Sequence, residues 1–290
     1  MTAFTLPGFD LDAFVSATLA EDLGEGLPGG GRDVTSESVI PADARFSGVM
    51  DSRDAIVVCG LPLAAAFFRA LDPDMRIDIL AEEGAAVPAG SDLMRLEGNA
   101  RAMLTAERSA LNTVQHLSGI ATMTRQYVDA IAQNERNRAT LLDTRKTIPG
   151  LRHLEKYATR TGGARNHRMG LWDAAMIKDN HVAVAGGVGE AVRRAKAAGV
   201  AEIICEVDRL DQIEPALVAG ATHLLLDNMG PALLAEAVAL VAGRVPCEAS
   251  GGVRLDTLPA IAASGVDYVS VGRLTQSAPA ADVGLDFTPL

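Results

Sequence analysis

The stretch that decides the fold begins with Leu141-Leu142-Asp143-Thr144-Arg145-Lys146 and ends with Ala175-Met176-Ile177-Lys178-Asp179-Asn180-His181. In both segments a short apolar run leads directly into polar and charged residues, as happens where a buried strand ends at a polar edge. The chain repeats this pattern in four later segments: Ile203-Ile204-Cys205-Glu206-Val207-Asp208, Leu224-Leu225-Leu226-Asp227-Asn228, Pro246-Cys247-Glu248-Ala249-Ser250-Gly251-Gly252 and Tyr268-Val269-Ser270-Val271-Gly272-Arg273. The six segments therefore predict six buried strands.

Helical segments separate most of these strands, and they are expected at residues 189–198, 210–219, 232–241 and 258–264. Alternating buried strands and helices form a parallel sheet, and six or more such units can curl into a barrel. In that architecture the carboxyl ends of the strands share one rim, where the chemistry takes place. We therefore expect the polar residues after all six strands to meet at one rim.

The first part of the chain has a different texture. Residues 9–23 predict an amphipathic helix, residues 46–58 and 77–97 predict strands, and residues 62–71 and 100–133 predict helices. Gly119 marks a break or a close contact within the last of these. We expect a mixed α+β domain over residues 1–115 and a barrel-like α/β domain over residues 116–290, with the C-terminal residues packing back on the first domain.

The charge distribution points to a small anionic ligand. The 290 residues carry a formal net charge of −11, yet residues 101–180 carry +6 and the remainder −17. A cationic island on an acidic protein is typical of an anion-binding pocket. Nucleic acid is not the expected partner, because the island has few aromatic residues and a polyanion needs a wide positive face. A nucleic-acid binder stays an alternative.

Cysteine usage and hydropathy predict a cytoplasmic protein. The three cysteines, Cys59, Cys205 and Cys247, form no C-x-x-C pair, so we interpret them as small buried hydrophobic residues in a reducing compartment rather than as disulfides or a zinc site. The first residues lack the basic and apolar regions of a signal peptide. No apolar run reaches membrane-spanning length, so no membrane association is expected.

Several cations follow the predicted strands. An arginine fork suits a carboxylate or a phosphate, and a lysine supplies a compact positive charge. Salt bridges to Asp143, Asp173 or Asp179 are the alternative for any single cation. Four or five converging cations are harder to explain in this way, because unpaired like charges need an anion to offset their repulsion. The cationic candidates are Arg145, Lys146, His167, Arg168 and Lys178.

Two acids end successive apolar strands. Glu206 and Asp227 would be costly to bury without a partner. Mg²⁺, completed by water and substrate oxygens, fits such a pair, as do ribose hydroxyls. Ion pairs with the lysines of the rim are the alternative.

The last two strands end in small residues. Ser250-Gly251-Gly252 and Ser270-Val271-Gly272 expose backbone N–H groups before helix N-termini, which suits a phosphate. A lone Ser-Gly-Gly is usually a turn, but two such segments on the final strands of a β/α barrel match a recurring phosphate site. The sequence offers no Ser or Cys triad. The remaining histidines are open: His116, His153 and His223 are interpreted as packing or surface residues, and His181 is undecided.

Longer motifs carry a resemblance to a known family. They include E-D-L-G at 21–24, D-V-T at 33–35, T-A-E-R-S-A-L-N at 105–112, L-S-G-I-A-T at 117–122, D-T-R-K-T-I-P-G-L-R at 143–152, L-E-K-Y-A, N-H-R-M-G-L, I-K-D-N-H-V, L-L-D-N, E-A-S-G-G-V and G-R-L-T-Q-S-A-P. Over nearly its whole length the chain resembles quinolinate phosphoribosyltransferase, also called nicotinate-nucleotide pyrophosphorylase (carboxylating). The resemblance implies a type II phosphoribosyltransferase-like α/β fold, in which an N-terminal α+β sandwich precedes an open (incomplete) α/β barrel.

The resemblance also implies an activity and an assembly. Quinolinate and phosphoribosyl pyrophosphate would give nicotinate mononucleotide, CO₂ and pyrophosphate in de novo NAD biosynthesis, with Mg²⁺ as cofactor. The protein would be a homo-oligomer, a dimer or a hexamer built of dimers. Arg108 would enter the active site of the neighbouring subunit.

The remaining roles follow from the same resemblance. Arg145, Lys146, His167, Arg168 and Lys178 would surround the quinolinate carboxylates and the phosphates. Glu206 and Asp227 would bind the ribose hydroxyls and Mg²⁺, and Ser250, Gly251, Gly252, Ser270 and Gly272 would bind substrate, mainly at the ribose 5-phosphate. Lys146, Lys178, Glu206 and Asp227 are the expected catalytic residues.

Three positions depart from the family pattern. The loop at 26–32 is longer, Ile204-Cys205 precedes Glu206 where an earlier acid is common, and Arg165 replaces a small or apolar residue and adds a cation near the site. Two other functions stay open. One is a sister phosphoribosyltransferase with another base, such as the paralogue associated with molybdate transport, and the other is a non-catalytic anion or nucleic-acid binder.

Overall fold

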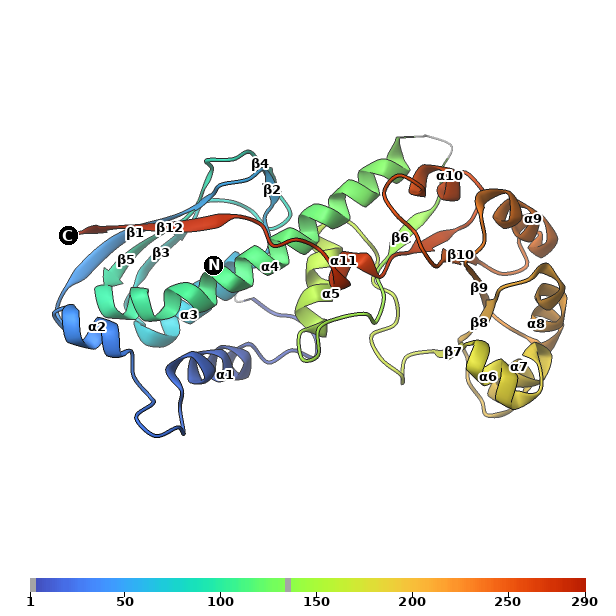
Figure 1. Ribbon diagram of the computed structural model, residues 1–290, viewed down its shortest axis with the longest axis horizontal. Helices are drawn as coiled ribbons and strands as arrows, with labels where there is room; N and C mark the ends of the chain where they lie inside the picture. The colour runs from blue at the N-terminus through green and yellow to red at the C-terminus, as the bar shows by residue number, and fades with distance from the viewer. Residues whose placement is uncertain (1–3, 134–136) are drawn as a thin grey trace. The chain divides into compact units, whose positions relative to one another are not determined.

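The computed structural model describes residues 4–133 and 137–290 and divides into two compact units (Figure 1). The first unit extends to Met123 and also includes His153–Gly162 and Ala278–Leu290, and the second comprises Thr124–Arg152 and Gly163–Ser277. The boundary expected near residue 115 stays a prediction about folding domains. The first unit extends to Met123, eight residues beyond this position, and it also contains the later segment His153–Gly162.

The first unit is built on a four-stranded antiparallel sheet. Its order is β12 (Val283–Pro289), β1 (Arg45–Ser52), β5 (Asp92–Asn99) and β3 (Arg76–Ile79). A two-stranded sheet pairs β2 (Ile56–Val57) with β4 (Ala86–Val87). Apart from β12, the strands of both sheets come from the two regions in which the sequence predicted strands. The last strand, β12, returns from the end of the chain to pair with β1.

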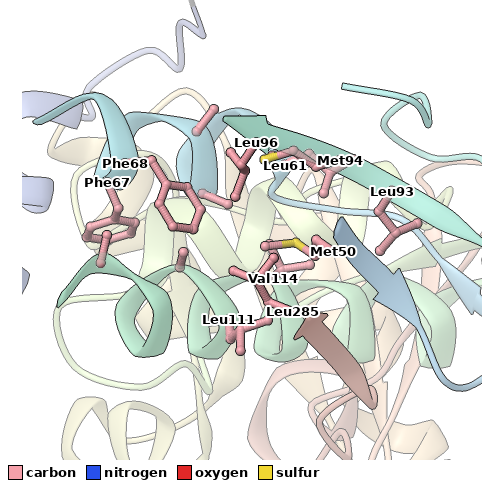
Figure 2. Close-up of a cluster of buried hydrophobic side chains, with 14 of the residues drawn as sticks. Met50, Leu61, Phe67, Phe68, Leu93, Met94, Leu96, Leu111, Val114 and Leu285 are labelled. Atoms are coloured by element: carbon pink, nitrogen blue, oxygen red, sulfur yellow. The ribbon is translucent and has the colours of Figure 1, made fainter. Parts of the chain in front are cut away.

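Helices cover this sheet and enclose an apolar core. The core-forming helices are α1 (Leu11–Leu23), α3 (Leu61–Leu71) and α4 (Ala100–Ala132). The unit also contains α2 (Val34–Val39) and most of α5 (Arg152–Thr161). Figure 2 shows Phe67 and Phe68 of α3 among side chains from β1, β5, α4 and β12. Both rings are fully buried. Removal of this apolar surface from water is the main contribution to the stability of the unit.

Gly119 is a close contact and not a break. The helix α4 is 33 residues long and passes through Gly119 without interruption. A Cβ at Gly119 would lie 2.0 Å from the carbonyl oxygen of Pro279, in the segment that leads to β12. The glycine therefore allows the returning chain to pass against the helix.

The second unit contains the predicted parallel sheet. Its strands are β6 (Thr140–Leu142), β7 (Ala175–Ile177), β8 (Ile203–Val207), β9 (His223–Asp227), β10 (Cys247–Ser250) and β11 (Tyr268–Ser270), in the order β6-β11-β10-β9-β8-β7. All neighbouring pairs are parallel. Within the described part of the chain no ladder joins β6 to β7, so the barrel is open. The predicted fold class is confirmed.

Helices follow most of these strands. They are α6 (Asp179–Ala185), α7 (Val188–Ala197), α8 (Ile213–Ala219), α9 (Pro231–Val241), α10 (Leu258–Ala262) and α11 (Arg273–Gln276), with a 3₁₀ turn at Leu210–Gln212. The helices expected at 189–198, 210–219, 232–241 and 258–264 are present. The helices α2, α5, α6 and α11 were not predicted from the sequence. Three of these span seven residues or fewer, too short for periodicity to reveal.

The strand register decides which side chains face the site. Glu206, Leu225, Glu248 and Tyr268 lie opposite one another on β8, β9, β10 and β11. Successive side chains on a strand point to opposite faces, so residues two positions further on share their face. Asp227 and Ser250 are such residues, and they are paired in register.

The structure also bears on the cysteines and on membrane insertion. Cys59, Cys205 and Cys247 are all buried and free, as predicted. Burial raises the pKa of the Cys205 thiol to about 12 and that of Cys247 to about 11, which keeps both thiols protonated. Across residues 4–133 and 137–290, no helix is both long and apolar enough to span a membrane.

Candidate active site

A cavity of about 790 Å³ lies in the second unit at the carboxyl ends of its strands. Its lining comes from the segments after β6, β7, β9, β10 and β11 and from residues 167–168. Eleven of the thirteen predicted site residues line it: Arg145, Lys146, His167, Arg168, Lys178, Asp227, Ser250, Gly251, Gly252, Ser270 and Gly272. The predicted shared rim is therefore present for five of the six strands, and β8 contributes no residue to the lining.

The cations in this cavity have few acidic partners. Lys178 Nζ contacts Glu206 Oε2 at 2.5 Å. Among the described residues Arg145, Lys146 and Arg168 form no ion pair, so the salt-bridge alternative fails for these three. Burial and the neighbouring Arg145 lower the pKa of Arg168, although Asp173 opposes this effect. Like charges held together in this way favour an anionic ligand.

Lys146 is held by the segment after β11. Its carbonyl oxygen accepts a hydrogen bond of 2.7 Å from Thr275 Oγ1 of α11. Its side chain passes over Gly272, where a Cβ would lie 2.7 Å from Lys146 Cδ. Gly272 has φ −69°, a conformation open to any residue, so the space taken by the lysine is what requires glycine here.

The two acids lie close enough to influence each other. Burial, and next the charge of Glu206, raise the pKa of Asp227, while Lys178 and Lys146 act in the opposite direction. Asp227 Oδ2 also accepts a hydrogen bond of 2.5 Å from Asn228 Nδ2. Glu206 does not line the cavity directly, and it reaches the site through Lys178. The expected pairing with a lysine is thus present for Glu206.

The loop after β10 depends on its two glycines. Gly251 and Gly252 have φ values of +88° and +61°, which favour glycine. A Cβ on Gly251 would lie 2.2 Å from Asn228 Oδ1. Asn228 itself has φ +55°, and its N–H donates to the Ser250 carbonyl oxygen at 2.9 Å. Strained backbone of this kind often occurs at functional sites.

Besides Glu206, two further residues singled out in the sequence fall outside this lining. Arg108 is exposed on α4 in the first unit and does not line the cavity. Arg165, expected to add a cation near the site, also lies outside the lining. Its guanidinium carbon is 5.6 Å from the centroid of the Tyr268 ring, and its NH1 donates to the Tyr268 hydroxyl at 3.2 Å.

Three of the four histidines left open now have partners. His181 Nδ1 accepts a hydrogen bond from the Lys178 backbone N–H at 2.9 Å, so it caps α6. His116 Nε2 contacts Glu155 Oε1 at 2.9 Å. His223 is buried, as expected of a packing residue, but its Nε2 lies 3.0 Å from Glu248 Oε2.

Sequence reasoning missed several residues that line the cavity. They are Thr144, Met176, Leu225, Asn228, Glu248, Val253, Arg254, Val271, Arg273 and Gln276. Glu248 was detectable, because it precedes Ser250 by two positions and must share its face. Its signal was an acid in the middle of a buried strand.

Two family descriptions match consecutive parts of the chain. "Quinolinate phosphoribosyl transferase, N-terminal domain" matches residues 33–118, and "Quinolinate phosphoribosyl transferase, C-terminal domain" matches residues 120–286. The chain belongs to the quinolinate phosphoribosyltransferase family. The resemblance inferred from the sequence motifs is confirmed.

Relatives in the quinolinate phosphoribosyltransferase family are similar along their full length. The probable nicotinate-nucleotide pyrophosphorylase [carboxylating] of Synechocystis is 42% identical, over 96% of this chain and 93% of the relative. The Mycobacterium leprae enzyme of the same name is 41% identical, over 94% and 95%. The crystal structure of NadC from Streptococcus pyogenes is 35% identical, covers 99% of both chains and has a TM-score of 0.91.

Proposed function

We propose that this protein catalyses the quinolinate phosphoribosyltransferase reaction of NAD biosynthesis. Quinolinate and phosphoribosyl pyrophosphate are converted to nicotinate mononucleotide, CO₂ and pyrophosphate. The observation that supports this proposal best is that Arg145, Lys146 and Arg168 converge on one cavity without acidic partners. Such a cavity suits one substrate with two carboxylates and another with phosphates. Membership of the family supports the same reaction.

The reaction needs positioning and charge rather than a covalent nucleophile. The quinolinate ring nitrogen attacks C1 of the ribose as the C1–pyrophosphate bond breaks, and positive charge develops at C1. The cations of the rim stabilise the departing pyrophosphate. The C–C bond to the 2-carboxylate then breaks as CO₂ leaves. The electron pair stays on C2, where the adjacent quaternised nitrogen stabilises it, and C2 then takes a proton from water. Holding both substrates in line is the main contribution of the enzyme.

We assign the recognition of the two substrates to different parts of the rim. Arg145, His167 and Arg168 serve the quinolinate carboxylates, and Lys146 and Lys178 serve the phosphates. The N–H groups of Ser250, Gly251, Gly252, Ser270 and Gly272 bind the ribose 5-phosphate, because exposed backbone donors suit a phosphate.

Mg²⁺ fits the acids of the site. Asp227 and Glu206 are coupled carboxylates whose mutual repulsion a cation would relieve. Among the described residues there is no group of three or more His, Cys, Asp or Glu side chains that could hold a metal. Glu206 and Asp227 would therefore hold Mg²⁺ together with water and substrate oxygens, as is usual for this ion. The ion would supply neutralisation of the pyrophosphate charge.

The assembly and location belong to the same proposal. Arg108 is exposed on the first unit, so it is available to a neighbouring subunit of a dimer or dimer-built hexamer. The free buried cysteines support a reducing compartment, the cytoplasm.

Turnover with quinolinate, phosphoribosyl pyrophosphate and Mg²⁺ tests the proposal, with the product identified by mass spectrometry. Lys146→Ala and Arg168→Ala should abolish turnover and leave the circular dichroism spectrum unchanged, because both side chains lie at the cavity and outside the core. Arg193→Ala, on the exposed face of α7, is the matched control. An active Arg168→Ala variant would refute the role of that residue.

The same assay separates the other functions. A sister transferase would release no CO₂ from quinolinate and would turn over another base. A non-catalytic binder would retain polyanions in a salt-dependent manner and show no turnover of phosphoribosyl pyrophosphate.

A further inference from the structure

Asn228 connects two parts of the rim that have different tasks in the proposed function. It is the first residue after β9, which ends at Asp227, one of the acids expected at the ribose hydroxyls. The neighbouring strand β10 ends at Ser250, where the segment assigned to the 5-phosphate begins. Asp227 and Ser250 are paired in register. Asn228 lines the cavity, yet the reaction described above gives it no part.

The side-chain amide of Asn228 contacts both of these groups. Its Nδ2 donates a hydrogen bond of 2.5 Å to Asp227 Oδ2, and the two groups are complementary because an amide NH₂ donates and a carboxylate accepts. Its Oδ1 is turned toward the loop after β10, where a Cβ built on Gly251 would lie 2.2 Å from it. Gly251 has no Cβ, so the backbone of this loop can lie directly against the amide.

The backbone of Asn228 joins the same two strands. Its φ is +55°, and its N–H donates to the Ser250 carbonyl oxygen at 2.9 Å. Among the residues that the structure describes, Ala242 is the one other non-glycine residue with a positive φ. Asparagine tolerates this conformation better than most residues, but glycine adopts it more readily still. The backbone conformation alone therefore does not explain why an amide side chain is present.

We propose that Asn228 is a positioning residue for the ribose 5-phosphate half of phosphoribosyl pyrophosphate: it fixes the Asp227 carboxylate relative to the backbone donors of residues 250–252. The inference rests on the proposed function, which assigns the ribose and its phosphate to these two groups. The ribose hydroxyls and the 5-phosphate belong to one small molecule, so the groups that bind them must keep a fixed separation. Asn228 maintains this separation because it contacts both groups.

The position of Asn228 allows its role to be tested without loss of the fold. The residue is exposed and does not belong to the buried core. Asp227 and Ser250 are held in their strands by the ladder between β9 and β10, which does not depend on the Asn228 side chain. Truncation of that side chain should therefore change the placement of the carboxylate and of the loop and leave the sheet intact.

Asn228→Gly removes both side-chain contacts and keeps a residue that readily adopts a positive φ. We expect the KM for phosphoribosyl pyrophosphate to rise about tenfold and the KM for quinolinate to change by less than about twofold. The melting temperature should not fall. Ala242→Gly is the matched control, because it makes the same backbone change at an exposed residue outside the cavity lining. It should leave both KM values unchanged.

Asn228→Asp separates the hydrogen bond from the shape of the side chain. Aspartate has nearly the same shape and tolerates the same backbone conformation, but it replaces the donor with a second carboxylate that repels Asp227. We expect the KM for phosphoribosyl pyrophosphate to rise at least as much as in Asn228→Gly. A wild-type KM for this substrate in either variant would overturn the proposal. An equally large rise in the KM for quinolinate would overturn it as well.

Binding of ribose 5-phosphate provides a measurement that needs no turnover. Isothermal titration calorimetry should show that the wild type binds this compound and that Asn228→Gly binds it about tenfold more weakly. Equal affinities, or no binding by the wild type, would contradict the proposal. Failure of the proposed function gives a different result, because the wild type then turns over no quinolinate while the titration still compares the two proteins.

Discussion

Single side chains set the geometry of the cationic rim. Lys146 crosses Gly272 with no room for a Cβ, and Gly251 approaches Asn228 just as closely. In both pairs, the position after one strand must be glycine because a side chain that follows another strand occupies the space of its Cβ. The glycines of this site therefore act through the neighbours they admit, as well as through the backbone conformations they allow.

Gly272→Ala should reduce activity without reducing stability. The backbone at Gly272 tolerates alanine, but the added Cβ would lie 2.7 Å from Lys146 Cδ and would displace that flexible side chain. We expect kcat/KM to fall by about ten- to a hundredfold, because the displaced ammonium no longer faces the substrate. Steady-state kinetics and thermal unfolding would measure the two quantities.

Gly230 provides a matched control for this change. It also has a negative φ and precedes a helix, and a Cβ there would meet nothing within 4 Å. Gly230→Ala should leave kcat/KM unchanged. If Gly272→Ala kept full activity, the idea that Lys146 must occupy this space would be wrong.

At the scale of elements, helix ends are completed by side chains distant in sequence. Glu83 accepts hydrogen bonds from the backbone N–H groups of Gly60 and Leu61 at the N-terminus of α3, at distances of 2.9–3.0 Å. The hydroxyl of Tyr157, on α5, donates to the same carboxylate at 2.6 Å. Burial and the charge of Glu83 raise the pKa of Tyr157, so this hydroxyl stays a donor. Glu83, which lies in the segment before β4, thus connects that segment to α3 and α5.

Replacing Glu83 with alanine should destabilise the first unit by about 1–3 kcal/mol. The loss comes from backbone donors left without an acceptor and from the missing negative charge at a helix N-terminus. Hydrogen exchange followed by mass spectrometry would show faster exchange in α3. Glu82→Ala, an exposed neighbour, is the control and should have no effect. Unaltered exchange in α3 for Glu83→Ala would contradict the assigned cap.

At the scale of the whole molecule, the end of the chain completes the first sheet. β12 forms the edge next to β1, and its Val283 and Leu285 are buried in the core of that unit. Gln115 Nε2 of α4 donates to the Val283 carbonyl oxygen at 2.8 Å. The first unit is therefore not complete until the last residues have been synthesised. Its folding requires β12 to contact β1, which lies far away in the sequence, and this is expected to slow folding.

Leu285→Ala should cost the first unit about 2–5 kcal/mol, because it leaves a cavity in a packed core. Asp286→Ala, at an exposed neighbouring position whose ion pair with Arg53 is at the surface, should cost less than about 1 kcal/mol. Urea unfolding monitored by hydrogen exchange in β1 and β5 would measure both. Equal effects of the two substitutions would mean that β12 does not belong to this core.

The sequence by itself determined the alternating strands and helices, the shared polar rim and most of its cations. Local hydrophobic patterns and residue chemistry are enough for these predictions, because each strand of a parallel sheet buries its apolar run and ends at the same edge. Tertiary structure alone decided that Lys146 lies over Gly272, that Glu248 meets His167 and His223, and that β12 returns to β1. These are contacts between residues far apart in the chain, and no local pattern records the distance or the orientation at which such residues meet.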